Sequence, residues 1–245
     1  MVELKPHPEA EKRFKPFLDD VLENRQDKIH SVHMTGSALT DDYDPRHSDI
    51  NSVCVLKDMD LKFLENLAPL GKKYAKKRVA APLIMTPAYV EQSLDVFPIE
   101  FLNIRMLHYT FLGEDIFKEI HIDPAHLRPQ CERELKVKLI ALRQGYISAS
   151  GDRKMLTDAF ISSFAGYIPL FRGIIVLLGK DAPTNSEDVL STLQDVANTD
   201  MAPFRTVLKQ KQERAKLSMA QLNTLFEDCY TVIEKLGNMA DEFEV

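Results

Sequence analysis

The chain has 245 residues, of which 44% are hydrophobic and 28% charged, with a formal net charge of -6 and a pI near 5.7. This length and composition are typical of one large globular domain or two smaller ones, and they exclude disordered and fibrous classes. The acidic balance argues against general nucleic-acid binding, which depends on clustered lysine and arginine. A small anionic ligand stays compatible with the composition, because it needs only a local positive site.

The cysteines and the amino terminus bear on the compartment. Cys54, Cys131 and Cys229 are odd in number and far apart, so they indicate neither a disulfide framework nor a zinc spacing, and we expect buried free thiols. The first residues, MVELKPHPEAEKRFK, contain no apolar signal segment. The most apolar stretch, 174–178, is far shorter than the roughly 20 residues that a membrane span needs. We therefore expect a cytoplasmic protein without a membrane partner.

The first half of the chain mixes helical and strand patterns. Apolar residues at steps of three and four predict helices, and short β-branched runs bounded by turn residues predict strands. Pro69 is expected to break or kink its helix, and Pro98 indicates a bulge or an edge position in its strand. The predicted elements, in chain order, are a helix over 8–25, neighbouring strands over 29–35 and 50–56, a helix over 58–76, and strands over 82–86 and 96–104.

After about Asp123 the pattern changes to long helical periodicity, and no clear strand signal returns. Leu135, Leu139 and Leu142 mark one face of the first of these helices. Apolar stripes of this kind bury themselves against each other. The further predicted helices cover 155–178, 187–198, 201–214 and 219–243. We therefore predict an α+β fold in two domains, a mixed sheet with flanking helices over 1–122 and an all-α up-and-down helical bundle over 123–245.

The stretch HMTGSALTDDYDPRHSDINSVCVL, from His33 to Leu56, carries the informative polar residues. The first predicted strand ends at Gly36 and Ser37, and the second opens with the residues SDIN at 48–51. Glycine lets the backbone pass close to a ligand. If a helical turn begins at Ser37, its free N–H groups and hydroxyl face an anion such as a triphosphate. The pattern predicts a phosphate site at this turn.

Residues 49 and 51 alternate on the second strand and therefore share one face of it. In phosphoryl and nucleotidyl transferases both positions are carboxylates, which hold Mg²⁺ ions that neutralise the triphosphate and activate the attacking hydroxyl. Asp49 fits this role, whereas Asn51 offers a carbonyl oxygen without a charge, so a second metal should bind much more weakly. The acids at 41–44 are alternatives, although acids beside a proline are more often turn-formers in solvent.

Gly36, Ser37 and Asp49 together resemble the motif of the DNA polymerase beta-like nucleotidyltransferase superfamily. Its pattern is a glycine-serine turn, a strand with two alternating acids and a third acid on a later strand. Bacterial enzymes resembling kanamycin nucleotidyltransferase follow this catalytic domain with a helical bundle, as predicted here, so the resemblance covers nearly the whole chain. The departure from the motif is Asn51.

For the third acid the resemblance leaves two candidates. Glu100 lies inside the predicted strand over 96–104, and Asp95 lies at its entrance. A half-buried carboxylate in an apolar run needs a partner or a metal, so we favour Glu100. Asp95 is better explained as a turn residue.

Arg172 lies in the otherwise apolar stretch YIPLFRGIIVLLG, where an unpaired guanidinium would be costly. A structural salt bridge is one interpretation, and contact with a phosphate or an anionic substrate is the other, so Arg172 is a candidate substrate-binding residue. His30 and His33 stand three apart on a predicted strand and point to opposite faces, which argues against a simple two-histidine metal site.

The resemblance implies a nucleoside triphosphate with Mg²⁺ bound between the two domains, and transfer of a nucleoside monophosphate to a hydroxyl of an unknown small-molecule or protein acceptor. Asp49 is then a metal ligand and Glu100 the second ligand or base. The residues implied to bind the nucleotide are Gly36, Ser37, Ser48 and Asn51. The alternative is a catalytically inactive member that acts by regulation or interaction, because Asn51 replaces the second carboxylate.

Overall fold

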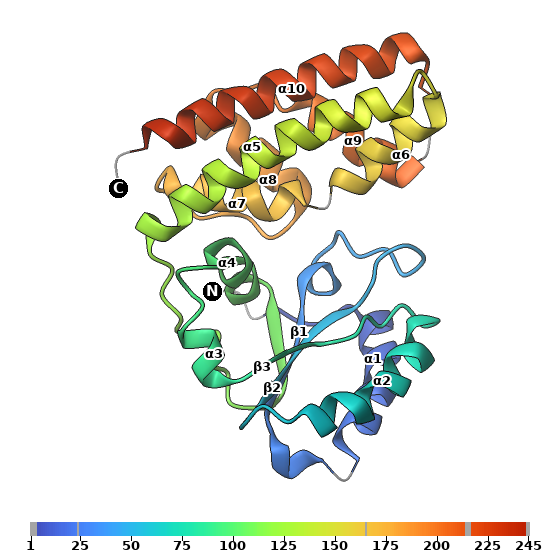
Figure 1. The fold of residues 1–245 in the computed structure, drawn as a ribbon, viewed down its shortest axis with the longest axis vertical. Coiled ribbons are helices and arrows are strands. Elements are labelled where there is room, and N and C mark those ends of the chain that lie inside the picture. The colour runs from blue at the N-terminus through green and yellow to red at the C-terminus, as the bar shows by residue number, and fades with distance from the viewer. Residues whose placement is uncertain (1–3, 24, 165, 214–216, 244–245) are drawn as a thin grey trace. The chain divides into compact units, whose positions relative to one another are not determined.

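The computed structural model describes residues 4–23, 25–164, 166–213 and 217–243. The chain divides into two compact units, one up to Ile122 and one from Asp123. The first unit holds all the strands among the described residues, and the second is helical (Figure 1).

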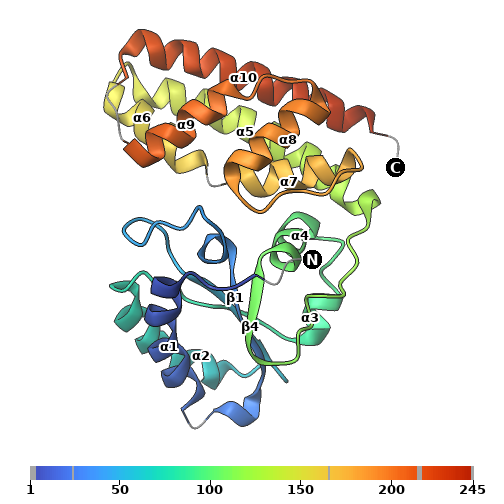
Figure 2. The ribbon, with the colours of Figure 1, turned by 180° about the vertical axis from the view of Figure 1, so that it is seen from behind.

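The first unit is built on a four-stranded mixed sheet. Its strands are β1 (Ile29–Thr35), β2 (Asn51–Leu56), β3 (Leu83–Met85) and β4 (His108–Gly113). Their order is β3-β2-β1-β4, where β1 is antiparallel to both neighbours and β3 runs parallel to β2. Seen from front and back, α1 (Pro8–Leu22) and α2 (Leu61–Ala75) cover one face of the sheet, and α3 (Pro87–Glu91) and α4 (Pro98–Met106) lie on the other (Figures 1 and 2).

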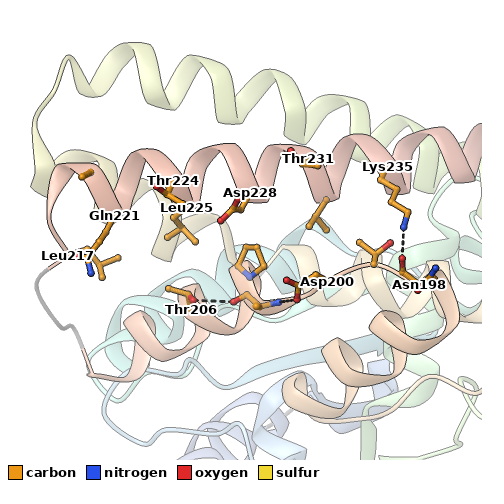
Figure 3. A pocket seen from close by; sticks show the side chains of 15 residues that line it. Asn198, Asp200, Thr206, Leu217, Gln221, Thr224, Leu225, Asp228, Thr231 and Lys235 are labelled. Atoms are coloured by element: carbon orange, nitrogen blue, oxygen red, sulfur yellow. Dashed lines mark hydrogen bonds between the residues drawn. The ribbon is translucent and has the colours of Figure 1, made fainter.

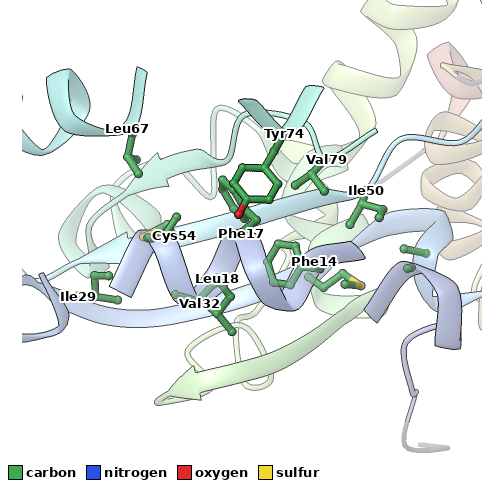
Figure 4. Close-up of a cluster of buried hydrophobic side chains, with 14 of the residues drawn as sticks. Phe14, Phe17, Leu18, Ile29, Val32, Ile50, Cys54, Leu67, Tyr74 and Val79 are labelled. Carbon is green, nitrogen blue, oxygen red and sulfur yellow. The ribbon is translucent and has the colours of Figure 1, made fainter. Parts of the chain in front are cut away.

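The core on the α1 side follows from strand alternation. Val32 and Met34 of β1 point to one face of the sheet, where Phe14 and Phe17 of α1 pack against them (Figure 4). Tyr74 of α2 closes this cluster, and its hydroxyl donates a hydrogen bond to the carbonyl of Pro16 at 2.7 Å. Ser31 and His33 of β1 are thereby directed to the opposite face, whereas the register shift between Ile29 and Ser31 keeps Ile29 on the α1 side.

The prediction of a strand over 96–104 is wrong, because α4 occupies these residues and the fourth strand follows at β4. Pro98 stands at the first helical position, where its missing N–H costs nothing. The buried Phe101, Leu102 and Ile104 then face the core at helical rather than strand spacing. Pro69 lies inside α2, which nevertheless continues to Ala75, so it does not end that helix.

The second unit is an assembly of helices, and α5 and α10 lie side by side in both views (Figures 1 and 2). Residues 155–178, predicted as one helix, form parts of α6 and α7. The helices are α5 (Pro124–Ala149), α6 (Arg153–Phe164), α7 (Tyr167–Leu177), α8 (Ser186–Ala197), α9 (Ala202–Glu213) and α10 (Met219–Glu242). The predicted fold class, a mixed sheet with flanking helices followed by a helical bundle, is confirmed.

All three cysteines are buried thiols outside any disulfide of the described residues, as predicted. Within the described part of the chain, no single helix is long and apolar enough to cross a membrane. Among the described residues, α6 and α7 have that length and composition when taken as a pair, and their axes differ by 45°.

Candidate functional site

The glycine-serine turn lies directly after β1 and beside the start of β2. Gly36 has a φ of +79° and opens a short 3-10 helix, Gly36–Leu39, and its N–H donates to the carbonyl of Leu107 at 3.0 Å. Thr35 pairs with Asn51, and a Cβ added to Gly36 would lie 3.7 Å from the Asn51 side-chain nitrogen. Two of the predicted site residues, Gly36 and Asn51, are therefore neighbours in space.

Ser37 is half-buried in this turn, and its hydroxyl makes no hydrogen bond to any of the residues that the structure describes. Its carbonyl accepts the N–H and the hydroxyl of Thr40, which fixes the turn. The helix is only four residues long, so its dipole is small. A phosphate at this position would depend on the hydroxyl and the local N–H groups more than on a helix terminus.

Asp49 lies just before β2, and its side chain is 62% exposed. Its Oδ1 lies 3.3 Å from Nη1 of Arg78, and the same nitrogen donates to the carbonyl of His47 at 3.0 Å. Arg78 follows α2 with a left-handed φ of 60° and is held there by the bond from the N–H of Ile50 to its carbonyl. The sequence does not single out Arg78, because the lysine-rich run before it is typical of a solvated helix end.

The third acid is not where the sequence placed it. Glu100 is exposed in the first turn of the helix α4, and Asp95 is exposed in the turn before it, so neither lies in a strand. The strand β2 lies between β1 and β3, and β3 with the three residues before it reads AAPLIM, without a carboxylate. The apolar residues of α4 satisfy both periodicities, which is why a strand was predicted there.

A pair of Mg²⁺ ions does not fit the residues present. Mg²⁺ sites need oxygen ligands and lean on carboxylates. At this edge of the sheet Asp49 is one carboxylate, already paired with Arg78, while Asn51 is neutral and β3 brings apolar side chains. This edge of the sheet therefore supplies too few carboxylates to hold two Mg²⁺ ions.

The loop before Asp49 is held by its own hydrogen bonds. Ser48, a predicted nucleotide-binding residue, accepts the N–H of Asp44 at its hydroxyl, 3.1 Å away. The side chain of His47 and the N–H of Arg46 hydrogen-bond to the Asp44 carboxylate and lower its pKa to about 2. Asp44 therefore acts in the turn, in agreement with the turn-forming interpretation of these acids.

Arg172 is buried in α7 of the second unit. Its Nε donates to the carbonyl of Pro183 at 2.9 Å, and its Nη2 donates to the carbonyl of Thr184. These bonds fasten the segment between α7 and α8 to the helix. These two bonds give Arg172 a structural role, and its contact with a phosphate or an anionic substrate stays a prediction.

A cluster that the sequence did not reveal lies between β1 and β4. One ligand atom each of His33, His108 and Asp115 lie within 4.8 Å of one another. Nε2 of His108 is 2.8 Å from Oδ1 of Asp115, and the ring of His33 is fully buried. Burial lowers the pKa of His33 to about 4, so its imidazole is neutral near pH 7. The missed strand β4 is what brings His108 beside His33.

A groove of about 690 Å³ lies in the second unit, between α9 and α10 (Figure 3). Asp200, Thr206 and Asp228 are among its polar lining residues. Lys235 donates to the carbonyl of Asn198 at one end, so its ammonium is used within the fold. None of the predicted site residues lines this groove.

Comparison with known proteins supports the fold but no family. No protein-family model matches the chain, and no curated protein matches it in sequence. Nine chains of solved structures match it. One is the spectinomycin adenyltransferase AAD(9) from Enterococcus, determined with ATP and spectinomycin, with a TM-score of 0.56 and 14% identity over 96% of this chain and 99% of that one. The chain therefore has a nucleotidyltransferase-like fold.

Proposed function

We propose that the first unit binds a nucleoside triphosphate at the Gly36–Ser37 turn, and that the chain acts as a nucleotide-binding protein with little transfer activity. The carrying observation is that Gly36 and Asn51 are neighbours, with Asp49 and Arg78 paired at 3.3 Å just before β2. In the nucleotidyltransferase superfamily that the motif resembles, the triphosphate binds at the corresponding glycine-serine turn. The fold shared with an adenyltransferase determined with ATP makes ATP the first nucleotide to test.

Arg78 supplies a positive charge next to Asp49. Its side chain is 40% exposed, and its guanidinium is oriented by the carbonyl of His47 and by Asp49. A guanidinium fixed in this way matches phosphate oxygens well. In the proposed complex the Arg78 guanidinium binds the phosphate oxygens, and the Ser37 hydroxyl donates a hydrogen bond to a phosphate oxygen.

Calorimetric titration with ATP and GTP, with and without Mg²⁺, tests the binding. Arg78→Met removes the charge and keeps the apolar stem, so we expect the Kd to rise by roughly fivefold or more, which is about 1 kcal/mol. Lys76→Met is the matched control, since it removes the same charge two residues earlier on an exposed position. Equal losses in both variants, or no binding by the wild type, would reject the site.

The second candidate function is transfer of a nucleoside monophosphate to a hydroxyl acceptor. It is favoured by the extent of the match, which covers 99% of the adenyltransferase chain. Incubation with labelled ATP or GTP, Mg²⁺ or Mn²⁺ and a cell extract tests it. Label on an acceptor that disappears with Asp49→Ala would establish transfer at this site, and binding without labelling supports the binding protein.

A further inference from the structure

We propose that His33, His108 and Asp115 form a binding site for one divalent transition-metal ion of the Zn²⁺ type. Two imidazoles and one carboxylate are a common set of ligands for Zn²⁺ and other divalent first-row transition metals, and water completes the coordination. Mg²⁺, by contrast, prefers oxygen ligands. The site is therefore separate in chemistry from the acidic motif at Asp49.

The hydrogen bonds around His108 call for a cation. Its Nδ1 lies 2.9 Å from the carbonyl of Ile104 and 3.1 Å from that of Arg105, and its Nε2 lies 2.8 Å from the carboxylate of Asp115. Carbonyl and carboxylate oxygens only accept, so Nδ1 carries the ring hydrogen and a neutral ring turns the Nε2 lone pair toward an anion. A second proton or a metal ion between Nε2 and Asp115 removes this conflict.

His33 is suited to be the second imidazole. Its Nδ1 lies 2.9 Å from the hydroxyl of Thr110, and its Nε2 lies 2.8 Å from the hydroxyl of Ser31. If one ring nitrogen binds the metal, the other can donate its hydrogen to its own hydroxyl partner, Thr110 or Ser31. Such a bond holds the ring in place, as hydrogen-bond partners of metal-bound histidines commonly do.

The distances require only small movements. Tetrahedral Zn²⁺ with bonds near 2.0–2.1 Å places its ligand atoms about 3.3 Å apart. The distance between the His108 Nε2 and Asp115 Oδ1 atoms would increase from 2.8 Å to this value. The largest distance between any two of the three ligand atoms, at most 4.8 Å, would decrease to it. Asp115 belongs to an exposed segment after β4, and its side chain is 37% exposed, so it can adjust and admits the ion from solvent.

The surroundings preorganise the two rings. Phe117 is fully buried and packs edge-on against His33, with ring centroids 4.8 Å apart, and against His108 at 5.9 Å. The N–H of Lys118 donates to Asp115 and holds the carboxylate toward His108. Phe117 and the N–H of Lys118 are therefore outer partners of the kind that orient the ligands of a metal site.

The test uses the full chain freed of metal with EDTA and then titrated with Zn²⁺ by calorimetry, and with Co²⁺ while the visible spectrum is recorded. We expect one ion per chain and the visible bands of Co²⁺ bound to histidine. Asp115→Asn should weaken binding by about tenfold or more, and His108→Asn should do the same. Glu114→Gln removes the neighbouring exposed acid and is the matched control.

Far-ultraviolet circular dichroism of each variant distinguishes loss of the site from loss of the fold. Asp115→Asn changes an exposed side chain and should remain folded, so it decides the matter even if His108→Asn unfolds. Failure of the wild type to bind Zn²⁺, or equal binding by wild type and Asp115→Asn, would overturn the proposal. Calorimetry of ATP is a separate readout, in which Asp115→Asn should behave as the wild type does.

Discussion

Replacing Gly36 by alanine isolates the backbone requirement of the proposed phosphate turn. The added Cβ would meet its nearest neighbour, the Asn51 side-chain nitrogen, at 3.7 Å, which is ordinary van der Waals contact. The space for a methyl group is therefore present. The cost comes from the φ of +79°, which is unfavourable by roughly 1–2 kcal/mol for a residue with a Cβ.

Gly113 of β4 provides the comparison, because it has the same φ of +79° but no space. A Cβ there would lie 2.0 Å from the carbonyl oxygen of His30 and 2.8 Å from the Cα of Ser31, both backbone atoms of a paired strand. The strands β1 and β4 would have to separate. We expect Gly113→Ala to cost more than about 4 kcal/mol, the range reached only by severe core disruptions.

Urea unfolding followed by circular dichroism measures both variants against the wild type. Gly36→Ala should lower the unfolding free energy by roughly 1–2 kcal/mol without changing the slope, and Gly113→Ala should lower it several kcal/mol further or prevent folding. Equal costs would show that the space beside Gly36 is not what the structure indicates. No cost for Gly36→Ala would show that its φ is not left-handed. The methyl group also narrows the approach to Asn51, so ATP affinity should fall in a folded Gly36→Ala protein.

Three further changes test the same region and its supports. Asn51→Asp places a second carboxylate beside Asp49, so its melting temperature should fall modestly in EDTA and recover with millimolar Mg²⁺ or Mn²⁺, while the wild type responds much less; equal metal responses would remove position 51 from the site. The pKa of Asp44 is lowered to about 2 by the hydrogen bonds from His47 and Arg46, so its stabilising contribution is present above the ordinary value of 3.8 and is lost as the pH falls through about 2. Unfolding measured between pH 2 and 5 should accordingly depend less on pH in Asp44→Asn, and an unchanged profile would contradict this. Gly71→Ala, inside α2 with no atom within 4 Å of the added Cβ, should raise the unfolding free energy by about 0.5–1 kcal/mol, and a loss in urea unfolding would contradict the open space.

The strands that carry the turn were predictable because their signals are local. The segments at 29–35 and 50–56 have β-branched residues and are separated by turn-forming residues, and they form β1 and β2. The long helix α10 of the second unit likewise repeats one apolar stripe over many turns, and Leu222, Leu225, Ile233 and Leu236 of this stripe are buried. In both cases short-range pattern and tertiary burial agree.

The prediction of a strand over 96–104, with Glu100 inside it, was wrong for one reason. The run around Pro98 places apolar residues at spacings that suit a strand or a helix, and a proline is acceptable at a strand edge or at the first position of a helix. Tertiary packing favours the helix α4 over Pro98–Met106, and the fourth strand forms at His108–Gly113 instead. The residues beside β1 are therefore those of His108–Gly113. Glu100 lies outside the sheet, and His108 lies within it.

The role of Arg78 could not be predicted from the sequence for a different reason. Nothing in the run KKYAKKRVA distinguishes Arg78 from the lysines before it. Its role follows from the end of α2, where its left-handed φ and the bond between its carbonyl and the N–H of Ile50 turn the side chain toward Asp49. Conformation at a single residue of this kind has no sequence signature unless the residue is glycine.

The balance of charge at the turn favours binding over transfer. An acid triad concentrates negative charge where a triphosphate must lie, so such a site depends on divalent cations to admit its substrate and to carry the reaction. Here Asn51 is neutral, β3 contributes no charge, and the charge of Asp49 is offset by Arg78 at 3.3 Å. A triphosphate therefore meets little repulsion without a metal but also finds little that would activate an attacking hydroxyl. Asn51→Asp reverses this balance with one atom exchange, which is why its response to metal separates the two functions.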